Sequence, residues 1–444
     1  MKEIKILHIT PHLGGGVGRV LLNYLEKVKG TGFSHKVICL EYANEKAILA
    51  AQVSGFSLSD KMSSNHDGIM AEVEKADIVL VHWWNHPLLN AFLVRESLPP
   101  ARIIFWSHIS GFHAPYVFSR PALNYPDLFV FTSPFSRDTQ EVKKLPDARQ
   151  KALRVIWSTG GIEHVASIMP KPHSGYRIGY IGTVDYSKMH PGFLKMSSLV
   201  KIPDVHFVIV GGPSERKIQE ESLQYEMGKR FTFTGYVGSI NQYLSEFDVF
   251  GYPLAPYHYG TCEQSLCESM AAGVPPVVLS NMTERYIVDD HVTGIVAAGE
   301  ESYAAAIEEL YLNPDLRRKL SDNARAAARR RFSLEKMVDS WDDAFNQVLN
   351  LPKTKREWTG RYAGKTVSPA HVFLESLGES GLEFQASLNA ETESEKKAAA
   401  ESIRKLYGTS PLWRSDTRGN PHHYHYFFPE DGYLKLWCDL EKME

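Results

Sequence analysis

Short runs of apolar and β-branched residues alternate along the chain with longer stretches that have the spacing of amphipathic helices. This alternation predicts parallel strands joined by helices, in sheets that are covered on both faces. The predicted strands are 4–10, 35–41, 77–84, 102–108, 128–133 and 154–159 in a first series, and 177–184, 206–212, 231–236, 249–254, 275–280 and 294–297 in a second. The pattern therefore predicts an α/β protein with two doubly wound domains.

The two series are separated by a stretch at 168–175 whose Pro, His, Gly and Ser residues have the composition of a linker. We therefore predict one Rossmann-like domain at 1–167 and a second at 176–335. A further helical pattern at 336–351 is expected to pack back on the first domain. Residues 352–444 contain few strand-like runs and form a C-terminal extension whose fold the pattern does not specify.

The composition is that of a soluble globular chain, because 43% of the 444 residues are apolar and 23% are charged. The net charge of -3 provides no positive field, so nucleic acid is not an expected partner. No apolar run reaches the ~20 residues that span a bilayer. Glu3 and His8 make the start of the chain a strand rather than a secretion signal. We expect a cytoplasmic protein, with contact at the inner face of the membrane left open.

Metal binding is not expected from the pattern of cysteines and histidines. The four cysteines are scattered and form no CxxC pair, which speaks against a structural zinc site and fits a reducing compartment. His82 and His86 have the spacing of helical metal ligands, but their flanks have the pattern of a strand and a turn.

Histidine is in excess, with 18 copies, and several copies follow predicted strands of the first series. In an open parallel sheet, ligands bind beyond the carboxyl ends of the strands. Neutral imidazole exchanges hydrogen bonds with sugar hydroxyls and can shuttle a proton. A single histidine is more often structural, but a cluster at one edge predicts a binding site. The residues concerned are His12, His82, His86, His108 and His113.

A glycine-rich turn, which includes Gly14, Gly15, Gly16 and Gly18, joins the first predicted strand to an amphipathic helix. Such a turn lets a ligand approach the backbone and lets a phosphate reach the helix N-terminus. The rival interpretation is a dinucleotide-binding fingerprint, but its third glycine would fall at Arg19. We therefore assign Gly15 and Gly16 to a ligand-binding turn of another kind.

The most distinctive segment is 259–278, which has the pattern of a loop, a helix that ends at Gly273, and an apolar strand. Ser265 and Leu266 lie near the start of the predicted helix. The backbone N–H groups there suit a diphosphate. Glu268 follows on the same helix, beside small residues that permit close packing.

This segment resembles the signature of the retaining glycosyltransferases of family four, which have the GT-B fold of two Rossmann-like domains facing across a cleft. In that family, two glutamates bracket the start of the helix. Glu268 matches the second, which hydrogen-bonds the ribose hydroxyls of the nucleotide. The first would fall at Gly260, and Glu263 is the nearby carboxylate that would take over its role beside the donor sugar.

The strand and turn after residue 177 are similar to the family's diphosphate-binding turn. Lys188 matches the lysine that neutralises the donor diphosphate, whereas Thr183 replaces an arginine, so that Arg285 or His190 would have to supply the missing charge.

Three further segments extend the resemblance over roughly residues 4–350. The segment with Tyr236 and Val237 resembles the strand end whose backbone meets the base. The Gly15-Gly16 turn and His108 resemble the amino-terminal donor turn and the histidine of the sugar pocket.

The resemblance implies a metal-independent hexosyltransferase that moves a sugar with retention from a UDP or GDP sugar, without a further cofactor. The acceptor would be a carbohydrate or a lipid-linked glycan, as in polysaccharide biosynthesis. The expected catalytic residues are His108, Glu263 and Lys188. His12, His82, His86 and His113 are the expected acceptor-side residues, because the first domain faces the acceptor in this family.

Two alternatives share these features. A nucleotide-sugar epimerase can have the same two-domain architecture. A non-catalytic nucleotide-sugar-binding subunit is favoured by Gly260 and Thr183, where the family carries charge.

The extension contains an aromatic segment at 422–428 that also includes His422, His423 and His425. Metal ligands and an acceptor platform are two interpretations, and a packing segment laid over the domains is the preferred one. With Trp413 and Trp437, the aromatic residues would bury a large area against the body of the protein or against a second copy in a homodimer.

Overall fold

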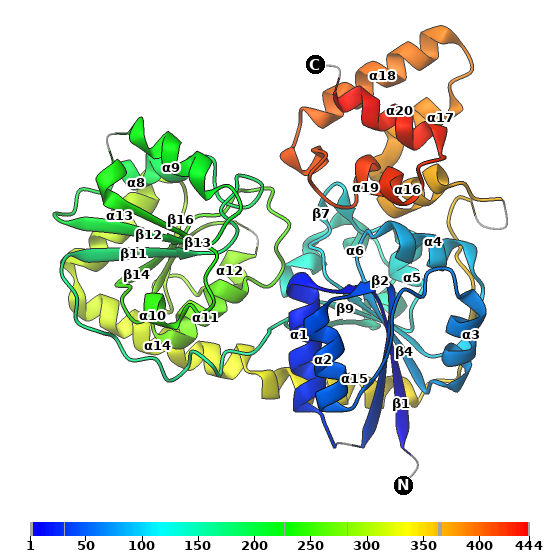
Figure 1. Cartoon of the computed structure of the whole chain (residues 1–444), viewed down its shortest axis with the longest axis horizontal. Helices are drawn as coiled ribbons and strands as arrows, with labels where there is room; N and C mark the ends of the chain where they lie inside the picture. Colours follow the sequence, from blue (N-terminus) through cyan, green and yellow to red (C-terminus); the bar gives the residue numbers. More distant parts are fainter. Residues whose placement is uncertain (1–2, 31, 226, 282, 363–365, 443–444) are drawn as a thin grey trace. The chain divides into compact units, whose positions relative to one another are not determined.

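The computed structural model describes residues 3–30, 32–225, 227–281, 283–362 and 366–442. The chain forms two compact units, which can be followed by colour in Figure 1. Unit 1 comprises Met1–Ser158 and Val338–Glu444, and unit 2 comprises Thr159–Met337. Each unit contains one parallel sheet with connecting helices, which confirms the predicted α/β class with two doubly wound sheets.

The sheet of unit 1 has seven strands in the order β10-β9-β6-β4-β1-β2-β3, and all its pairings are parallel. Every residue of the central strand β4 is buried, as expected for a strand that is covered on both faces. The strands are β1 (Ile4–Leu13), β2 (Phe33–Ala43), β3 (Ser57–Ser59), β4 (Ile78–Trp83), β6 (Ile103–Ser107), β9 (Leu128–Phe131) and β10 (Leu153–Val155).

Helices α2 to α5 of unit 1 begin at polar residues whose side chains cap them. Asn44 Oδ1 accepts a hydrogen bond from Ala47 N at 2.9 Å, and Asn65 Oδ1 accepts one from Gly68 N at 3.0 Å. Each cap pairs an N–H group that the first turn of a helix leaves unsatisfied. The helices are α1 (Gly15–Lys27), α2 (Glu45–Ser54), α3 (His66–Lys75), α4 (Pro87–Arg95), α5 (Arg120–Asn124), α6 (Gln140–Lys143) and α7 (Asp147–Gln150).

Unit 2 has a six-stranded parallel sheet in the order β13-β12-β11-β14-β15-β16. Its strands are β11 (Tyr176–Ile181), β12 (Val205–Val210), β13 (Phe231–Gly235), β14 (Val249–Tyr252), β15 (Pro276–Leu279) and β16 (Ile295–Ala297). Its helices are α8 (Phe193–Ser198), α9 (Glu215–Leu223), α10 (Asn241–Leu244), α11 (Gln264–Ala272), α12 (Glu284–Ile287), α13 (Glu300–Leu312) and α14 (Pro314–Phe332).

Every strand of the two predicted series is present, which confirms the sequence pattern at that level. The prediction missed β3, as well as two short antiparallel pairs: β5 (Leu98–Ala101) with β17 (Thr354–Arg356), and β7 (Phe112–His113) with β8 (Tyr116–Val117). Strands this short carry too few residues for an alternating pattern to stand out.

Helix α15 (Leu334–Leu349) follows α14 and belongs to unit 1 from Val338 onward. The ring of Trp341 lies 4.8 Å from that of Trp106, and the ring of Phe345 lies 5.4 Å from that of Phe33. These contacts attach the helix to the face of the sheet in unit 1.

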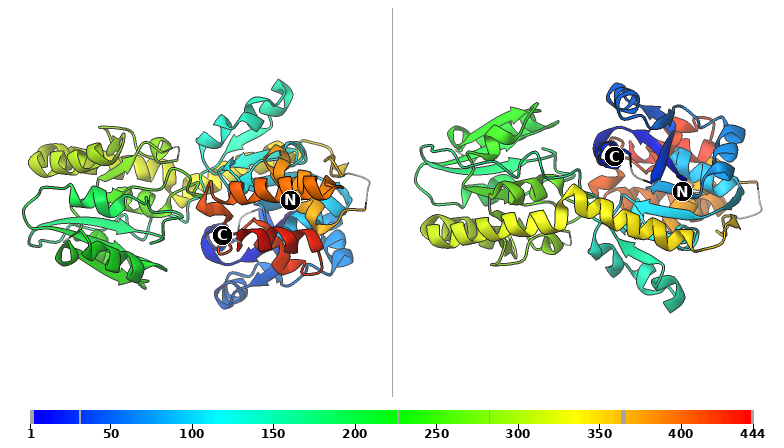
Figure 2. Two further views of the ribbon diagram at one scale, coloured as in Figure 1. Left: turned by 90° about the horizontal axis from the view of Figure 1, so that it is seen from above. Right: turned by 90° about the horizontal axis from the view of Figure 1, so that it is seen from below.

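The extension is helical and shares the hydrophobic core of unit 1. Figures 1 and 2 show its helices grouped together. Helices α16 and α19 contact α4, which belongs to the body of unit 1, that is, residues 1–158 together with α15. Asn90 donates a buried hydrogen bond of 2.8 Å to the hydroxyl of Tyr424, which joins body and extension. The helices are α16 (Pro369–Leu377), α17 (Leu382–Asn389), α18 (Glu393–Tyr407), α19 (Pro421–Phe427) and α20 (Gly432–Glu441).

The aromatic segment at 422–428 lies mostly in α19. Tyr424 is fully buried and so are Trp413 and Trp437, whereas Tyr426 is 76% exposed. Part of the segment therefore packs into the core, in line with the preferred interpretation.

Replacing Trp437 with alanine is expected to reduce the free energy of unfolding of unit 1 by about 3–5 kcal/mol, because a large buried side chain leaves a cavity. The indole also donates to Ser387 Oγ at 3.1 Å. Urea unfolding measures the loss. It is monitored by the circular dichroism of the backbone, so that the signal does not depend on the tryptophan that is removed. The exposed Tyr426→Ala variant is the control, with an expected change within about 0.5 kcal/mol. Equal losses in both variants would contradict the burial of Trp437 against Phe373 of α16 and Phe384 of α17.

No helix in the described parts of the chain combines the length and the apolar character that crossing a bilayer requires.

Candidate active site

The loop between β14 and α11 places the most distinctive sequence segment at the carboxyl edge of the sheet in unit 2. Gly273 ends the helix with φ of 79°, a conformation that glycine adopts without strain. At the start of α11, Gln264 Oε1 accepts from Gly160 N, and Gln264 Nε2 donates to Gly161 O, both at 2.8 Å. Gln264 therefore holds the segment near Gly160 within unit 2.

Glu268 lies one turn further along α11 and is 2% exposed. Its Oε1 accepts a hydrogen bond of 3.0 Å from Gln264 Nε2 and lies 3.2 Å from His164 Nε2. These partners fix the carboxylate in place without a bound nucleotide. A fixed carboxylate of this kind is suited to accept hydrogen bonds from vicinal hydroxyls such as those of a ribose.

Lys188 and Glu263 form a buried ion pair beside the same loop. Lys188 Nζ lies 2.9 Å from Glu263 Oε2, and the side chains are 16% and 1% exposed. Tyr252, at the end of β14, donates a hydrogen bond of 2.7 Å to the same carboxylate oxygen. The structure thus brings together two of the residues that the sequence analysis assigns to catalysis.

Mutual attraction keeps both groups charged despite their burial. Burial, the largest single influence, would lower the pKa of Lys188, but Glu263 together with Tyr259 and Glu284 outweighs it and the pKa is raised. Burial would likewise raise the pKa of Glu263, but Lys188 and His258 outweigh it and the pKa is lowered. An ammonium group is therefore held at this edge of the sheet at neutral pH.

The ion pair predicts a pH window for the stability of unit 2. Because the folded pKa of Glu263 lies below its ordinary value of 4.5, its stabilisation is present above pH 4.5 and is lost as the pH falls through the folded pKa. Because the folded pKa of Lys188 lies above 10.5, its stabilisation is present below that pH and is lost as the pH rises through the folded pKa. The difference in unfolding free energy between the wild type and Lys188→Met should be largest between these limits. A difference that is constant from about pH 3 to about pH 11 would contradict the ion pair.

Gly260 leaves room for the carboxylate of Glu263. A Cβ atom built on Gly260 would overlap Oε1 of Glu263. The carboxylate therefore occupies space that any larger residue at position 260 would need. The carboxylate of Glu263 thus lies where the side chain of a larger residue at position 260 would begin.

A Gly260→Ala variant should therefore lose about 1–3 kcal/mol of unfolding free energy, since its Cβ would displace a well-packed buried group. Gly238→Ala is the matched control in unit 2, because a Cβ built there meets nothing within 4 Å. Chemical denaturation of both variants gives the comparison. A loss no greater than that of the control would show that the Glu263 carboxylate does not lie against Gly260.

His258, Glu263 and Glu284 are the buried group among the described residues whose donor atoms could hold a metal ion, since these atoms lie within 4.8 Å of one another. Both ring nitrogens of His258 already contact protein groups, whereas Glu263 Oε1 and both carboxylate oxygens of Glu284 are buried without a hydrogen-bond partner. His258 Nδ1 accepts from Gly260 N at 3.1 Å, and His258 Nε2 lies 3.0 Å from Glu284 Oε1. Lys188 offsets the charge of Glu263 within this group.

The other residues that are expected to bind the donor lie around the same sheet edge. Ser265 and Leu266 are in the first turn of α11. Tyr236 follows the end of β13 and is 79% exposed, and Val237 is half-buried. Thr183 O accepts a hydrogen bond of 2.7 Å from the hydroxyl of Tyr180.

Of the two proposed substitutes for the missing arginine, Arg285 is a cation at neutral pH and His190 is not. Burial lowers the pKa of the half-buried His190, so the ring is neutral at pH 7. The guanidinium of Arg285 lies 5.4 Å from the centre of the Tyr286 ring on α12.

In unit 1, the glycine turn joins β1 to α1 and offers space at the helix start. Gly15 has φ of 60°, and a Cβ on either Gly15 or Gly16 would meet nothing within 4 Å. Gly14 and Gly18 instead have no room for a side chain, because of Tyr42 and the Leu13 backbone. Gly15 and Gly16 are therefore the positions at which a ligand can approach the backbone.

The five predicted histidines separate into distinct groups. His12 and His86 lie together, with ring centres 6.2 Å apart, and His86 Nε2 lies 3.1 Å from Glu41 Oε2. His82 and His108 stack with ring centres 5.4 Å apart and share a hydrogen bond of 3.2 Å. His113 lies on the short strand β7, opposite Tyr116 of β8.

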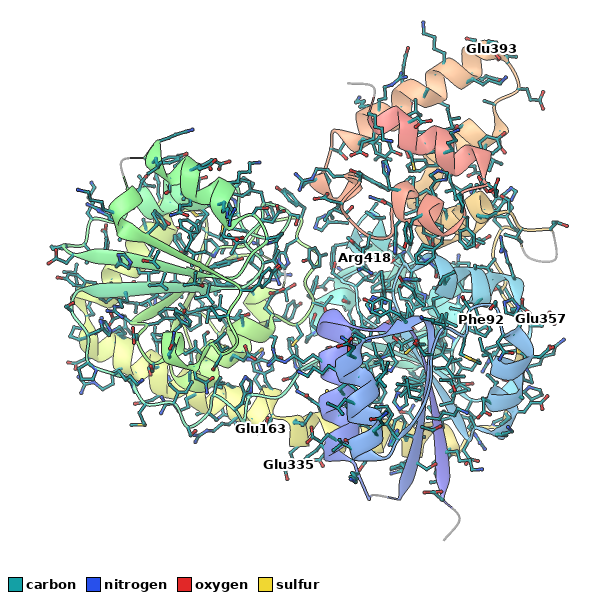
Figure 3. The ribbon with its side chains drawn as sticks, in the orientation of Figure 1. Phe92, Glu163, Glu335, Glu357, Glu393 and Arg418 are labelled. Atoms are coloured by element: carbon teal, nitrogen blue, oxygen red, sulfur yellow. The ribbon has the colours of Figure 1, made fainter. Side chains whose placement is uncertain are left out.

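The group around His12 also contains residues from the extension, which the sequence analysis missed. Arg418 NH1 lies 3.3 Å from His12 Nε2, and its guanidinium lies 5.9 Å from the Trp84 ring centre. The ring of His423 stacks on Trp84 at 6.0 Å. Figure 3 labels Arg418, which lies where the extension meets the body of unit 1. No local pattern signals this contact, because Arg418 is far from His12 in the sequence.

Burial keeps these rings neutral at pH 7. Burial, and then the charge of Arg418, lowers the pKa of His12 to about 4. Burial, and then His86, lowers the pKa of His423 to about 2. Arg418 is therefore the cation that the extension adds to this edge of the sheet.

Residues 165–327, which lie within unit 2, match the family model described as "Glycosyl transferases group 1". The chain is 25% identical over 177 residues to "Putative glycosyltransferase EpsD" of Bacillus subtilis (strain 168), a match that covers 39% of this chain and 45% of that protein. It is 23% identical over 327 residues to "Putative glycosyltransferase YtcC" of the same organism, covering 65% of this chain and 77% of that protein. The chain thus spans less than half of the first of these relatives.

Solved structures of low sequence identity share the fold. A glycosyltransferase from Rickettsia africae ESF-5 aligns with a TM-score of 0.64 at 14% identity, over 79% of this chain and 100% of that chain. Anabaena Alr3699/HepE in complex with UDP aligns with a TM-score of 0.62 at 14% identity, over 78% of this chain and 100% of that chain. The chain therefore has the GT-B fold, and unit 2 carries a group 1 glycosyl transferase segment.

Proposed function

We propose that this protein is a glycosyltransferase that moves a hexose from a UDP or GDP sugar to a carbohydrate or lipid-linked acceptor, with retention at the anomeric carbon. The observation that carries the proposal is the buried Lys188–Glu263 pair beside the start of α11, inside the segment that matches the family model. The glycosyltransferase relatives and the UDP-bound structural neighbour support a nucleotide sugar as the donor.

The chemical difficulty of this reaction is the departure of a nucleoside diphosphate, which gathers negative charge on phosphate oxygens. An ammonium group that is already fixed and partly shielded from water stabilises that charge with little reorganisation. Lys188 is such a group, because Glu263 holds it in place and keeps it charged. The N-terminal turn of α11, with Ser265 and Leu266, adds backbone N–H groups that suit the same diphosphate.

In this proposal protein groups do the work for which other transferases use a divalent ion, and no cofactor is needed. The pairing of His258 and Glu263 with neighbouring protein groups supports this view. Glu268 would accept hydrogen bonds from the ribose, and the backbone at Tyr236 and Val237 would meet the base. His108 would contact a hydroxyl of the donor sugar.

The experiment is NMR of the full chain incubated with a donor labelled with ¹³C at the anomeric carbon, in a panel of UDP and GDP sugars, with and without oligosaccharide acceptors. Transfer gives a new glycosidic anomeric signal with the configuration of the donor, together with free nucleoside diphosphate. A sugar that stays on the nucleotide with a changed hydroxyl configuration would identify an epimerase. Donor binding without any reaction across the panel would identify a binding subunit.

A further inference from the structure

A row of four histidines crosses the sheet of unit 1 and ends at His108. His35 lies on β2, His8 on β1 and His82 on β4, and these strands and β6 are neighbours in the sheet. His35 Nδ1 lies 2.9 Å from His8 Nε2, His8 Nδ1 lies 3.1 Å from His82 Nε2, and His82 Nδ1 lies 3.2 Å from His108 Nε2. Every contact therefore joins Nδ1 of one ring to Nε2 of the next.

The rings of this row are neutral. His8 and His82 are fully buried, and His35 and His108 are partly exposed. Burial, and then the neighbouring rings His35 and His82, lowers the pKa of His8 far below its ordinary value, and burial lowers the pKa of His82 to about 3. Within the described residues, no carboxylate pairs with any of the four rings. The nearest ring neighbours of the row from other elements are Tyr24 of α1 and Trp106 of β6.

Neutral rings in such a row have only two fully paired arrangements. Each ring carries one N–H, and each of the three contacts needs one N–H facing one lone pair. The remaining N–H must then lie at one end, either on His108 Nδ1 or on His35 Nε2. Choosing one end fixes the tautomer of all four rings.

The His35 end of the row decides between the two arrangements. His35 Nε2 is buried and has no hydrogen-bond partner. A buried N–H without an acceptor is more costly and rarer than an unpaired lone pair. The arrangement that leaves only a lone pair on His35 Nε2 is therefore favoured, and it places the N–H on His108 Nδ1.

We propose that His35, His8 and His82 are positioning residues that hold His108 as its Nδ1–H tautomer, so that it presents a hydrogen-bond donor to an oxygen atom of a bound ligand. The inference that the row sets the tautomer depends only on the contacts between the rings. The inference that the N–H group meets a hydroxyl or a developing oxyanion of the donor sugar rests on the proposed function. A donor fixed in advance suits an oxygen whose negative charge grows during reaction.

The test is long-range ¹H–¹⁵N NMR of the full chain labelled with ¹⁵N-histidine, with the His108 signals assigned by their loss in His108→Gln. In the wild type near pH 7, Nδ1 of His108 should be protonated and Nε2 should not. The opposite pattern, or an imidazolium at His8 or His82, would overturn the proposal. This measurement needs no stable variant of the row.

A matched pair of variants tests the coupling along the row. His35→Asn places an amide that can donate where Nδ1 was, whereas His35→Asp places a carboxylate that only accepts. Nδ1 should therefore remain the donor in each contact between the remaining rings in His35→Asn, whereas Nε2 should become the donor in His35→Asp. The ratio of the two His108 tautomers should change about tenfold between the variants, the equivalent of one net hydrogen bond. The same ratio in both folded variants would overturn the proposal.

The two proposals fail in different ways. If the proposed function is wrong, the NMR difference between the variants remains and no chain transfers sugar. If the row does not set the tautomer, His108 is unchanged in both variants, whatever the rate of transfer.

Discussion

Replacing Lys188 with methionine is expected to lower kcat for sugar transfer by about 10²–10³-fold, the range found when one preorganised charge donor is removed from a transition state. The reason is the position of Nζ, which lies 2.9 Å from Glu263 beside α11 and is held as an ammonium group. Methionine keeps much of the side-chain volume but loses the charge. Steady-state transfer assays with saturating donor measure the effect.

Lys195→Met is the control for this variant. Lys195 is also a lysine of unit 2 in an ion pair, with Glu300, but its side chain is 60% exposed. We expect near-normal turnover there, because exposed pairs contribute little. Lys188→Met leaves a buried carboxylate without its partner, at a cost of about 3–5 kcal/mol in stability. Melting curves therefore accompany the assay, and Lys188→Arg, which keeps the charge, should retain part of the turnover. Near-normal transfer by a folded Lys188→Met would reject the role of Lys188.

Replacing Glu268 with alanine is expected to weaken nucleoside diphosphate binding by about 10–150-fold, which corresponds to the ~1.5–3 kcal/mol of a hydrogen bond to a charged group. Gln264 and His164 already hold the Glu268 carboxylate, so the wild-type residue needs little ordering when the nucleotide binds. Isothermal titration calorimetry gives the dissociation constants.

The exposed Glu301→Ala variant on α13 is the matched control, because it removes the same charge from unit 2 away from α11. It should bind the nucleotide as the wild type does. Equal affinities in Glu268→Ala and Glu301→Ala would show that Glu268 does not contact the ribose.

The fold could be predicted from the sequence because its strands are continuous apolar runs. β4 is an example: all of its residues are buried, and its boundaries differ little from the predicted 77–84. The sequence also carries a helix-breaking signal at Asn313-Pro314, where α13 ends at Leu312 and α14 begins at Pro314. The fold of the extension was harder to predict, because most of its helices are short and pack into the shared core of unit 1.

The expected donor-binding residues of the candidate site could be predicted because the segment 259–278 resembles a family signature. Its difference from that signature at Gly260 was also informative. In the sequence, Gly260 stands where the family signature has its first glutamate. In the structure, the missing side chain makes room for Glu263, which pairs with Lys188. The role of Glu263 in transfer stays a prediction.

The histidine group of unit 1, which is expected to face the acceptor, could be predicted only in part. The sequence placed His12, His82 and His86 at strand ends, but it gave no sign that Arg418 and His423 from the extension reach the same group. His8 and His35 were also missed as members of a row. A histidine inside an otherwise apolar strand, as at His8, was the available signal, but pairing across strands depends on a register that the sequence does not specify.

The central claim is that unit 2 binds the nucleoside diphosphate of the donor through Lys188 and Glu268. Calorimetric titration of the full chain with UDP and with GDP, repeated on Lys188→Met, Glu268→Ala and the two control variants, tests it most directly. The account predicts that one of the two nucleotides binds at a single site, with affinity reduced at least about tenfold in Lys188→Met and Glu268→Ala and unchanged in Lys195→Met and Glu301→Ala. Absence of binding by the wild type, or equal affinity in all the variants, would contradict it.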